Sequence, residues 1–204
     1  MPYFSGPEML IRIPALLIAI TFHEYAHARV SYALGDPTPK WTGRLTLNPL
    51  SHLDPIGLLM LWIFKFGWAK PVMVDPGYYR NRKTGMILTS MAGPLTNLLL
   101  ALITLALLKL DIFSGLSASF IEMLFFYNLI LAVFNLIPLP PLDGSKILSG
   151  FLPGSLSDTF AQLETYGPLI LIFLVYFNII DIILDPLILV VLNILDSITS
   201  LLIF

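Results

Sequence analysis

Long apolar runs dominate the pattern of this chain and predict membrane-spanning helices. A helix needs roughly 20 predominantly apolar residues to cross the hydrocarbon core of a bilayer. Five runs of about this length are present, at residues 9–34, 84–108, 118–138, 161–180 and 186–204. The last two are separated by the acidic segment Asp181 to Asp185. The pattern therefore predicts an all-α polytopic membrane protein with a bundle of about five transmembrane helices.

The segment between the first two runs, residues 36–83, has a different pattern. Its apolar stretch Ile56 to Phe66 is too short to cross a bilayer, so we expect a re-entrant or interfacial helix there. The alternation in Arg44-Leu45-Thr46-Leu47 predicts a short strand or hairpin at the interface. After the third span, the prolines at 138–141 cannot continue a helix, and residues 145–152 are predicted as a short new one.

Composition supports a membrane protein and excludes several other classes. Hydrophobic residues make up 57% of the chain and charged residues 12%, with a mean hydropathy of +0.86. We expect one membrane-embedded domain over residues 1–204, with a core at 9–150 and C-terminal helices at 160–204. The net charge is −2 and no basic face is present, so the lipid bilayer is an expected partner and nucleic acid is not. Without cysteine, only His, Asp and Glu remain to bind a metal.

Three ionisable residues, His23, Glu24 and His27, interrupt the first span. Histidines four residues apart share a helix face and can bind one Zn²⁺, while the adjacent glutamate reaches a water on the same ion. In a soluble helix this pattern commonly arises by chance. Inside a membrane such groups are costly, which favours a functional site.

Zinc needs further ligands, and Asp143, just after the third span, is the strongest candidate for a third. The second and third spans cross in opposite directions. Asp143 therefore returns to the level of the histidines only if residues 35–83 cross the membrane an even number of times, and the short apolar stretch predicts no crossing. The alternative is that residues 55–69 do cross, with Lys65 reaching the headgroups, which would place Asp143 at the opposite face.

The basic residues indicate which face of the membrane the predicted metal site lies near. Eight of the eleven Lys and Arg residues lie between positions 29 and 83: Arg29, Lys40, Arg44, Lys65, Lys70, Arg80, Arg82 and Lys83. Cytoplasmic loops carry an excess of such residues. We therefore expect a multi-pass protein of the plasma or inner membrane with its metal site towards the cytoplasm.

Two histidines and an aspartate leave a fourth zinc position for water, the arrangement of a catalytic site. Glu24 could take a proton from that water and pass it to a leaving amine, which predicts amide hydrolysis of a membrane-embedded peptide. Two alternatives remain open. One is a non-proteolytic protein whose metal site is structural or binds substrates without cutting them. The other is an ion or metal transporter, which would need polar sites through the whole bilayer depth.

Three motifs together resemble the site-2 protease family of intramembrane zinc metalloproteases. They are His23-Glu24-x-x-His27, Ala92-Gly93-Pro94-x-x-Asn97, and Asn135-Leu136-Ile137-Pro138 leading to Leu142-Asp143-Gly144. The resemblance covers about residues 9–150 and is to the compact prokaryotic form, without a preceding span and without PDZ or CBS domains.

The resemblance implies one Zn²⁺ per chain held by His23, His27 and Asp143, with Glu24 as catalytic base. It also implies that Asn135 assists substrate or oxyanion binding, and that the substrates are transmembrane proteins. Residues 67–72 would form a membrane-associated strand.

Other polar residues are expected to be structural. His52 is a minor candidate ligand, and a loop hydrogen bond is the favoured interpretation. Asn97 is expected to bond a neighbouring helix, and Gly93-Pro94 to mark close packing or a kink. The sequence does not determine the oligomeric state.

Overall fold

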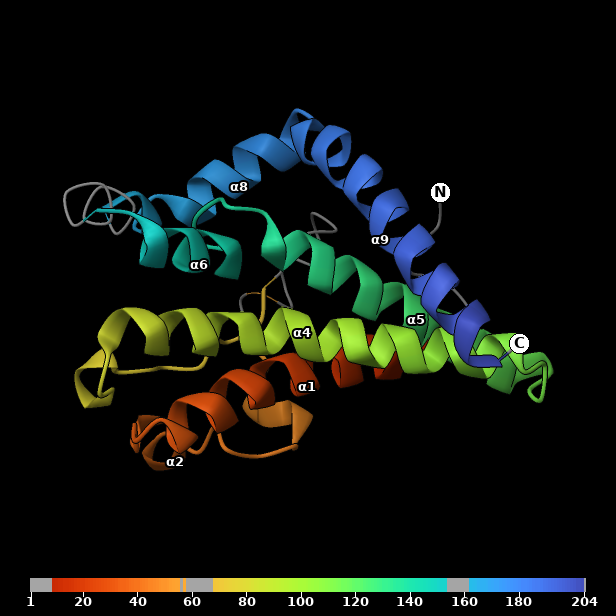
Figure 1. The fold of residues 1–204 in the computed structure, drawn as a ribbon, viewed down its shortest axis with the longest axis horizontal. Helices are drawn as coiled ribbons and strands as arrows, with labels where there is room; N and C mark the ends of the chain where they lie inside the picture. The colour runs from red at the N-terminus through yellow and green to blue at the C-terminus, as the bar shows by residue number, and fades with distance from the viewer. Residues whose placement is uncertain (1–8, 56, 58–67, 154–161, 204) are drawn as a thin grey trace.

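The computed structural model describes residues 9–55, 57, 68–153 and 162–203, and its centre is a bundle of three long helices (Figure 1). These are α1 (Met9–Ala33), α4 (Arg82–Lys109) and α5 (Gly115–Leu136), which pack together and alternate in direction. Among the described residues, each of the three is long and apolar enough to cross a membrane. The first three predicted spans are therefore confirmed, with small differences at their ends.

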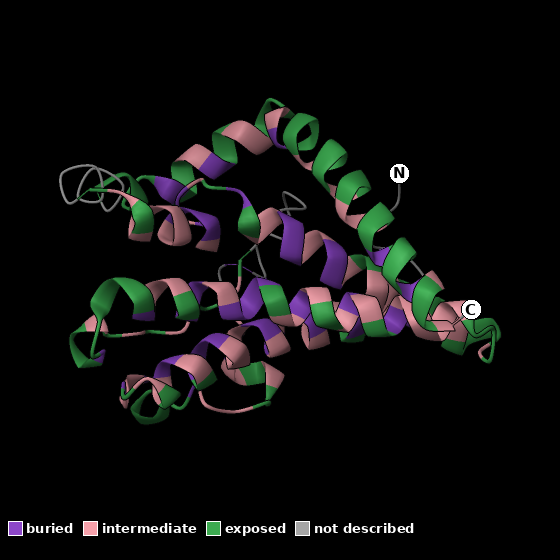
Figure 2. Ribbon diagram, viewed as in Figure 1, coloured by how far each residue is buried: buried purple, intermediate pink, exposed green. Residues whose placement is uncertain are grey.

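The contact between α1 and α4 is made by two rows of small and polar residues spaced four apart. Residues at this spacing share a helix face, and small side chains allow helices to approach closely. The buried row on α1 is Ala15, Ala19, His23, His27 and Ser31, and the buried row on α4 is Gly85, Thr89, Gly93, Asn97 and Ala101. Figure 2 shows buried residues gathered where α1, α4 and α5 face one another. The predicted ligands thus lie inside the helix contact.

The C-terminal region forms a bent pair of helices, α8 (Gly167–Tyr176) and α9 (Ile179–Ile203), with an angle of 86° between them. Together they are apolar and long enough for one further span, so the described residues contain three to four candidate spans. The all-α bundle is confirmed, but the predicted break at Asp181 to Asp185 is wrong. The chain bends at Asn178, whose φ of 55° is tolerated by asparagine. Asp181 instead lies in the first turn of α9, where the helix dipole favours it, and Asp185 follows one turn later.

Helix α6 (Asp143–Phe151) follows the proline-rich turn and packs on α4 and α5. It confirms the predicted short helix but starts at Asp143 itself. A Cβ at Gly144 would lie 2.4 Å from the carbonyl oxygens of both Leu136 and Ile137. Only glycine therefore allows α6 to begin directly against the end of α5, and this close start sets the position of Asp143.

The described part of the insertion contains α2 (Thr38–Trp41) and two 3₁₀ turns, η1 (Pro49–Ser51) and η2 (Pro76–Tyr78). The strand predicted at residues 44–47 is wrong, because these residues are irregular, with bends at Leu45 and Thr46. The loop is closed by side chains instead. Arg44 donates to the carbonyl oxygen of Ser51, and His52 Nε2 lies 2.8 Å from the carbonyl oxygen of Thr46. The alternation of polar and apolar residues does not produce a strand here, because the described residues contain no neighbouring strand to pair with it.

The two ends of the apolar insertion meet. Leu53 and Ala69 form an antiparallel bridge, and the Lys70 N–H donates to the carbonyl oxygen of His52 over 2.9 Å. The two ends of this segment therefore lie at the same depth in the membrane, as an even number of crossings requires. The re-entrant helix predicted at residues 56–66 lies, apart from Gly57, outside the described residues.

Asp36 joins the end of α1 to the segment that precedes α4. Its carboxylate accepts hydrogen bonds from the Ser31 hydroxyl at 2.7 Å, the Asp75 N–H at 2.8 Å and the Thr38 N–H at 2.9 Å. Burial raises the pKa of this carboxyl, but these hydrogen bonds outweigh burial and leave the pKa below its usual value. The ionised form therefore stabilises the fold.

Replacing Asp36 by Asn should lower stability, because an amide cannot accept from all three donors. We expect a loss of roughly 1–3 kcal/mol at neutral pH. The lowered pKa means that the stabilisation is present above the unfolded pKa of about 3.9 and is lost as pH falls through the folded value. Thermal melts of purified protein across pH 3–7 measure this. The difference between wild type and Asp36→Asn should shrink at acid pH.

The matched control is Asp75→Asn, at an exposed carboxylate that caps η2 and whose acceptor an amide can replace. It should melt close to wild type. Equal losses in both variants, or a difference that does not depend on pH, would contradict the assigned role of Asp36.

Candidate metal centre

The three predicted ligands meet at one point between α1 and α6. Asp143 Oδ2 lies 3.1 Å from His23 Nε2 and 3.0 Å from His27 Nε2, and the two Nε2 atoms are 3.0 Å apart. Both imidazoles are buried and Asp143 is partly buried. The structure thus brings together residues that are 120 positions apart in the chain, as the topological argument required.

The opposite ring nitrogen of each histidine is hydrogen-bonded. His27 Nδ1 lies 2.7 Å from the carbonyl oxygen of Thr89, and His23 Nδ1 lies 2.6 Å from Asn97 Oδ1. A carbonyl oxygen can only accept, so the proton of the neutral His27 ring is on Nδ1 and its Nε2 carries a lone pair. This is the usual arrangement of a metal-binding histidine, whose second nitrogen donates to a nearby acceptor.

The meeting point therefore holds acceptor atoms that need a cation. The Asp143 carboxylate faces the two Nε2 atoms at 3.0–3.1 Å. A proton on one ring or a metal ion between all three could satisfy them. Ligands on a tetrahedral zinc, at about 2.0–2.1 Å from the ion, lie roughly 3.3 Å from each other, close to the separations seen here.

Glu24 lies beside the ligands and keeps acceptor capacity. Its Oε2 accepts a hydrogen bond from the Val72 N–H over 3.1 Å. A carboxylate offers about four lone-pair positions, so this contact leaves sites for a water. Glu24 is next to His23 in the chain and lines the same cavity, as predicted.

The cavity has a volume of about 620 Å³ and is mostly apolar. Helices α1, α4, α5, α6 and α8 contribute to it, together with residues 68–74 of the insertion. Its polar lining includes His23, Glu24, His27, Asn135, Asp143 and Lys146. An apolar cleft with a few convergent polar groups is typical of a site for a largely apolar ligand.

The other predicted residues have different outcomes. Asn135 lines the cavity, and its Nδ2 donates to the Leu131 carbonyl oxygen one turn earlier. His52 forms the expected loop hydrogen bond, and among the described residues the candidate metal group contains only His23, His27 and Asp143. Asn97 does bond neighbouring helices, but one of its partners is the predicted ligand His23.

Two residues that help to hold the histidine rings were not predicted. They are Thr89 and Asn128. Thr89 acts through its backbone carbonyl, which side-chain chemistry cannot reveal. Asn128 is a fully buried amide on α5 that accepts from Asn97. The signal that could have found it is an amide in an otherwise apolar span, because such a group must find a partner within the bundle.

The sequence was also compared with known proteins. A model described as "Peptidase family M50" matches residues 110–175. The chain is 41% identical over 184 residues to "Putative zinc metalloprotease YwhC" of Bacillus subtilis (strain 168), covering 86% of this chain and 83% of that protein. It is 31% identical over 179 residues to "Putative zinc metalloprotease Rip2" of Mycolicibacterium smegmatis, covering 84% of this chain and 68% of that protein. No solved structure matches the chain. With its apolar helices, this chain belongs to the membrane metalloproteases of peptidase family M50, the site-2 protease family, in a compact form.

Proposed function

We propose that this protein hydrolyses peptide bonds within the membrane-spanning segments of substrate proteins. It would use one Zn²⁺ per chain, held by His23, His27 and Asp143. The observation that carries the proposal is the meeting of these three ligand atoms, all within 4.8 Å of one another, beside Glu24 in an apolar cavity. Zinc is also the metal in the names of the similar proteins.

The surroundings of the three ligands fit a metal ion. A Cβ at Gly93 would lie 2.4 Å from His27 Nε2 and 2.7 Å from His23 Nε2, so glycine keeps this side of the rings clear. Both Nδ1 atoms are bonded to acceptors, which leaves the Nε2 lone pairs for a cation. When bound, zinc supplies Lewis-acid polarisation of water and of a peptide carbonyl.

The protein side chains carry the proton and orient the substrate. Glu24 acts as general base and returns the proton to the leaving amine, with its carboxylate held by the Val72 N–H. Asn135 donates one N–H to Leu131 and would offer the other to a substrate carbonyl. The apolar cavity wall suits the side chains of a membrane segment.

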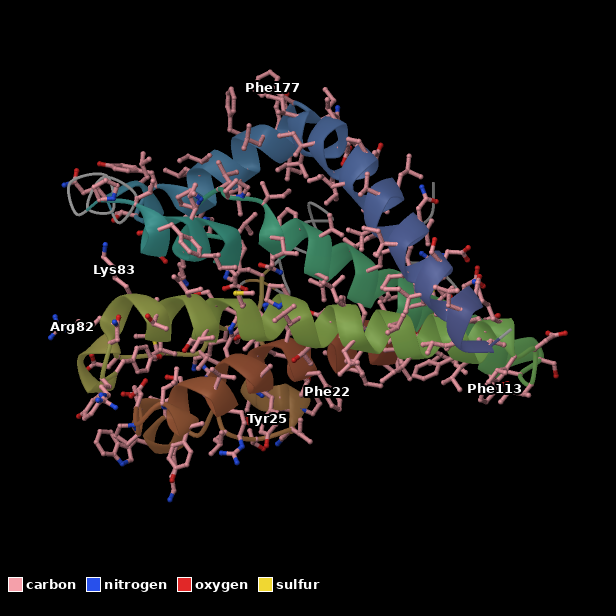
Figure 3. All side chains as sticks on the ribbon, in the orientation of Figure 1. Phe22, Tyr25, Arg82, Lys83, Phe113 and Phe177 are labelled. Atoms are coloured by element: carbon pink, nitrogen blue, oxygen red, sulfur yellow. The ribbon has the colours of Figure 1, made fainter. Side chains whose placement is uncertain are left out.

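The distribution of charge supports a site near the cytoplasmic face of the plasma or inner membrane. Arg82 and Lys83 project from the end of the bundle where α4 begins, and Phe113 lies at the opposite end (Figure 3). The basic excess between positions 29 and 83 belongs to the segment that joins α1 to α4. The positive-inside bias therefore supports a cytoplasmic position for that end.

We also propose that residues 1–204 act as one peptidase domain, with the core at 9–150 completed by the C-terminal helices at 160–204. In support, α9 packs on both α4 and α5. Lys109 Nζ lies 2.7 Å from Asp196 Oδ1 and connects α4 to the later part of α9.

Replacing Glu24 by Gln should separate metal binding from hydrolysis. The amide keeps the size of the side chain but cannot take a proton, so cleavage of a membrane-segment reporter should fall by about 10²–10⁴-fold. Zinc content, measured by elemental analysis, should remain near one per chain. Glu122→Gln is the control, because Glu122 is an exposed carboxylate on α5 outside the cavity lining. Undiminished cleavage by Glu24→Gln would remove Glu24 as the base. A wild type that holds zinc but cleaves no membrane segment would indicate a structural metal site.

Replacing Gly93 by Ala should weaken zinc binding by about tenfold or more, because the new methyl group displaces the ligand rings. Competition with a chelator of known affinity measures the change. The control is Gly150→Ala, whose Cβ would also lie 2.4 Å from a neighbouring atom, but that atom is Cγ1 of Ile87 and no candidate ligand is involved. Equal zinc affinity in Gly93→Ala and wild type would contradict the assigned position of the ion.

A further inference from the structure

The His23 ring is held by a chain of two buried amides rather than by the backbone directly. Its Nδ1 lies 2.6 Å from Asn97 Oδ1, and Asn97 Nδ2 lies 2.7 Å from Asn128 Oδ1. Both asparagines are fully buried. These hydrogen bonds link all three central helices, from His23 on α1 through Asn97 on α4 to Asn128 on α5.

Two backbone carbonyls decide which way each amide points. Asn128 Nδ2 donates to the Leu124 carbonyl oxygen at 2.7 Å, so Asn128 must turn its Oδ1 towards α4. Asn97 Nδ2 donates to the Ala19 carbonyl oxygen at 3.1 Å and to Asn128 Oδ1, which uses both of its hydrogens. The Asn97 oxygen is then the only atom of that amide left to face His23. Because this oxygen can only accept, the His23 proton lies on Nδ1 and Nε2 is left with its lone pair.

We propose that Asn128 is a positioning residue for the metal site. Through Asn97, it sets the orientation and tautomer of the His23 ring so that Nε2 is directed at Asp143 and available to a metal ion. The inference rests on the proposed zinc site but concerns a residue 31 positions from Asn97 and outside the cavity lining.

The two histidines are consequently held in different ways. The acceptor for His27 is a backbone carbonyl, that of Thr89, and it cannot be removed by a side-chain substitution. The acceptor for His23 is the Asn97 side chain, whose orientation is fixed by the Ala19 carbonyl and the Asn128 side chain together. A merely structural role, in which Asn128 joins α4 and α5, predicts lower stability without a matching loss of metal affinity. Metal affinity therefore distinguishes the two roles.

Three variants at position 128 test the proposal. Asn128→Leu removes the acceptor for Asn97. Asn128→Ser is too short to reach Asn97 but can still donate to Leu124 within its own helix, which helps to keep the fold. Asn128→Asp is the conservative variant: burial favours its neutral form, whose O–H can donate to Leu124 while its C=O accepts from Asn97. Thr104→Val is the control, since Thr104 is a buried residue of α4 whose hydroxyl donates to the Leu100 and Ala101 carbonyl oxygens of its own helix.

Zinc affinity is measured by chelator competition on purified protein, and the visible spectrum of the cobalt-substituted protein reports ligand geometry. We expect Asn128→Leu and Asn128→Ser to bind zinc about 10–100-fold more weakly, with an altered cobalt spectrum. Asn128→Asp and Thr104→Val should stay within about threefold of wild type. Size-exclusion profiles and thermal melts identify variants that fail to fold. If Asn128→Leu fails to fold, the comparison of zinc affinity between Asn128→Ser and Asn128→Asp tests the proposal.

Wild-type zinc affinity in a folded Asn128→Ser or Asn128→Leu protein would overturn the proposal, and so would equal losses in Asn128→Ser and Asn128→Asp. These results leave the proposed function intact. Conversely, a wild type that binds zinc with the expected dependence on Asn128 but cleaves no membrane segment overturns the proposed function alone. A wild type without zinc overturns both.

Discussion

Three acceptor atoms facing one another inside an apolar bundle are the constraint on which this structure depends. His23 Nε2, His27 Nε2 and Asp143 Oδ2 lie 3.0–3.1 Å apart. In hydrocarbon surroundings such groups are costly unless each is paired, and lone pairs directed at one another require a cation between them. The packing around the site can therefore be understood as what holds these atoms in place.

The same helix faces that make the bundle also make the site. Rows of small and polar residues four apart bring α1 and α4 close together, and His23, His27 and Asn97 are members of those rows. Close approach is what allows a backbone carbonyl of α4 to reach the His27 ring. It also makes Gly93 necessary, because any side chain there would occupy the space of the imidazoles. Helix packing and the candidate metal site thus use one set of contacts.

Some features could be predicted because they depend on local spacing or on topology. The positions of the first three spans follow from long apolar runs, and the shared face of His23 and His27 follows from helical periodicity. Asp143 could be assigned because the number of membrane crossings decides at which face it lies. The strand at residues 44–47 and the break at Asp181 to Asp185 were wrong because tertiary contacts and one left-handed residue, Asn178, decide those regions.

The sequence by itself determined the kinds of candidate ligand, the helix that carries two of them and the face at which the third arrives, since periodicity and apolar length are properties of the chain alone. Only the tertiary structure decided how these candidate ligands are oriented. The carbonyl of Thr89 and the amide of Asn128 act on histidines of another helix. Whether a hydrogen bond forms between helices depends on their separation and rotation. Side-chain packing across the whole bundle sets both, and no local sequence pattern encodes them.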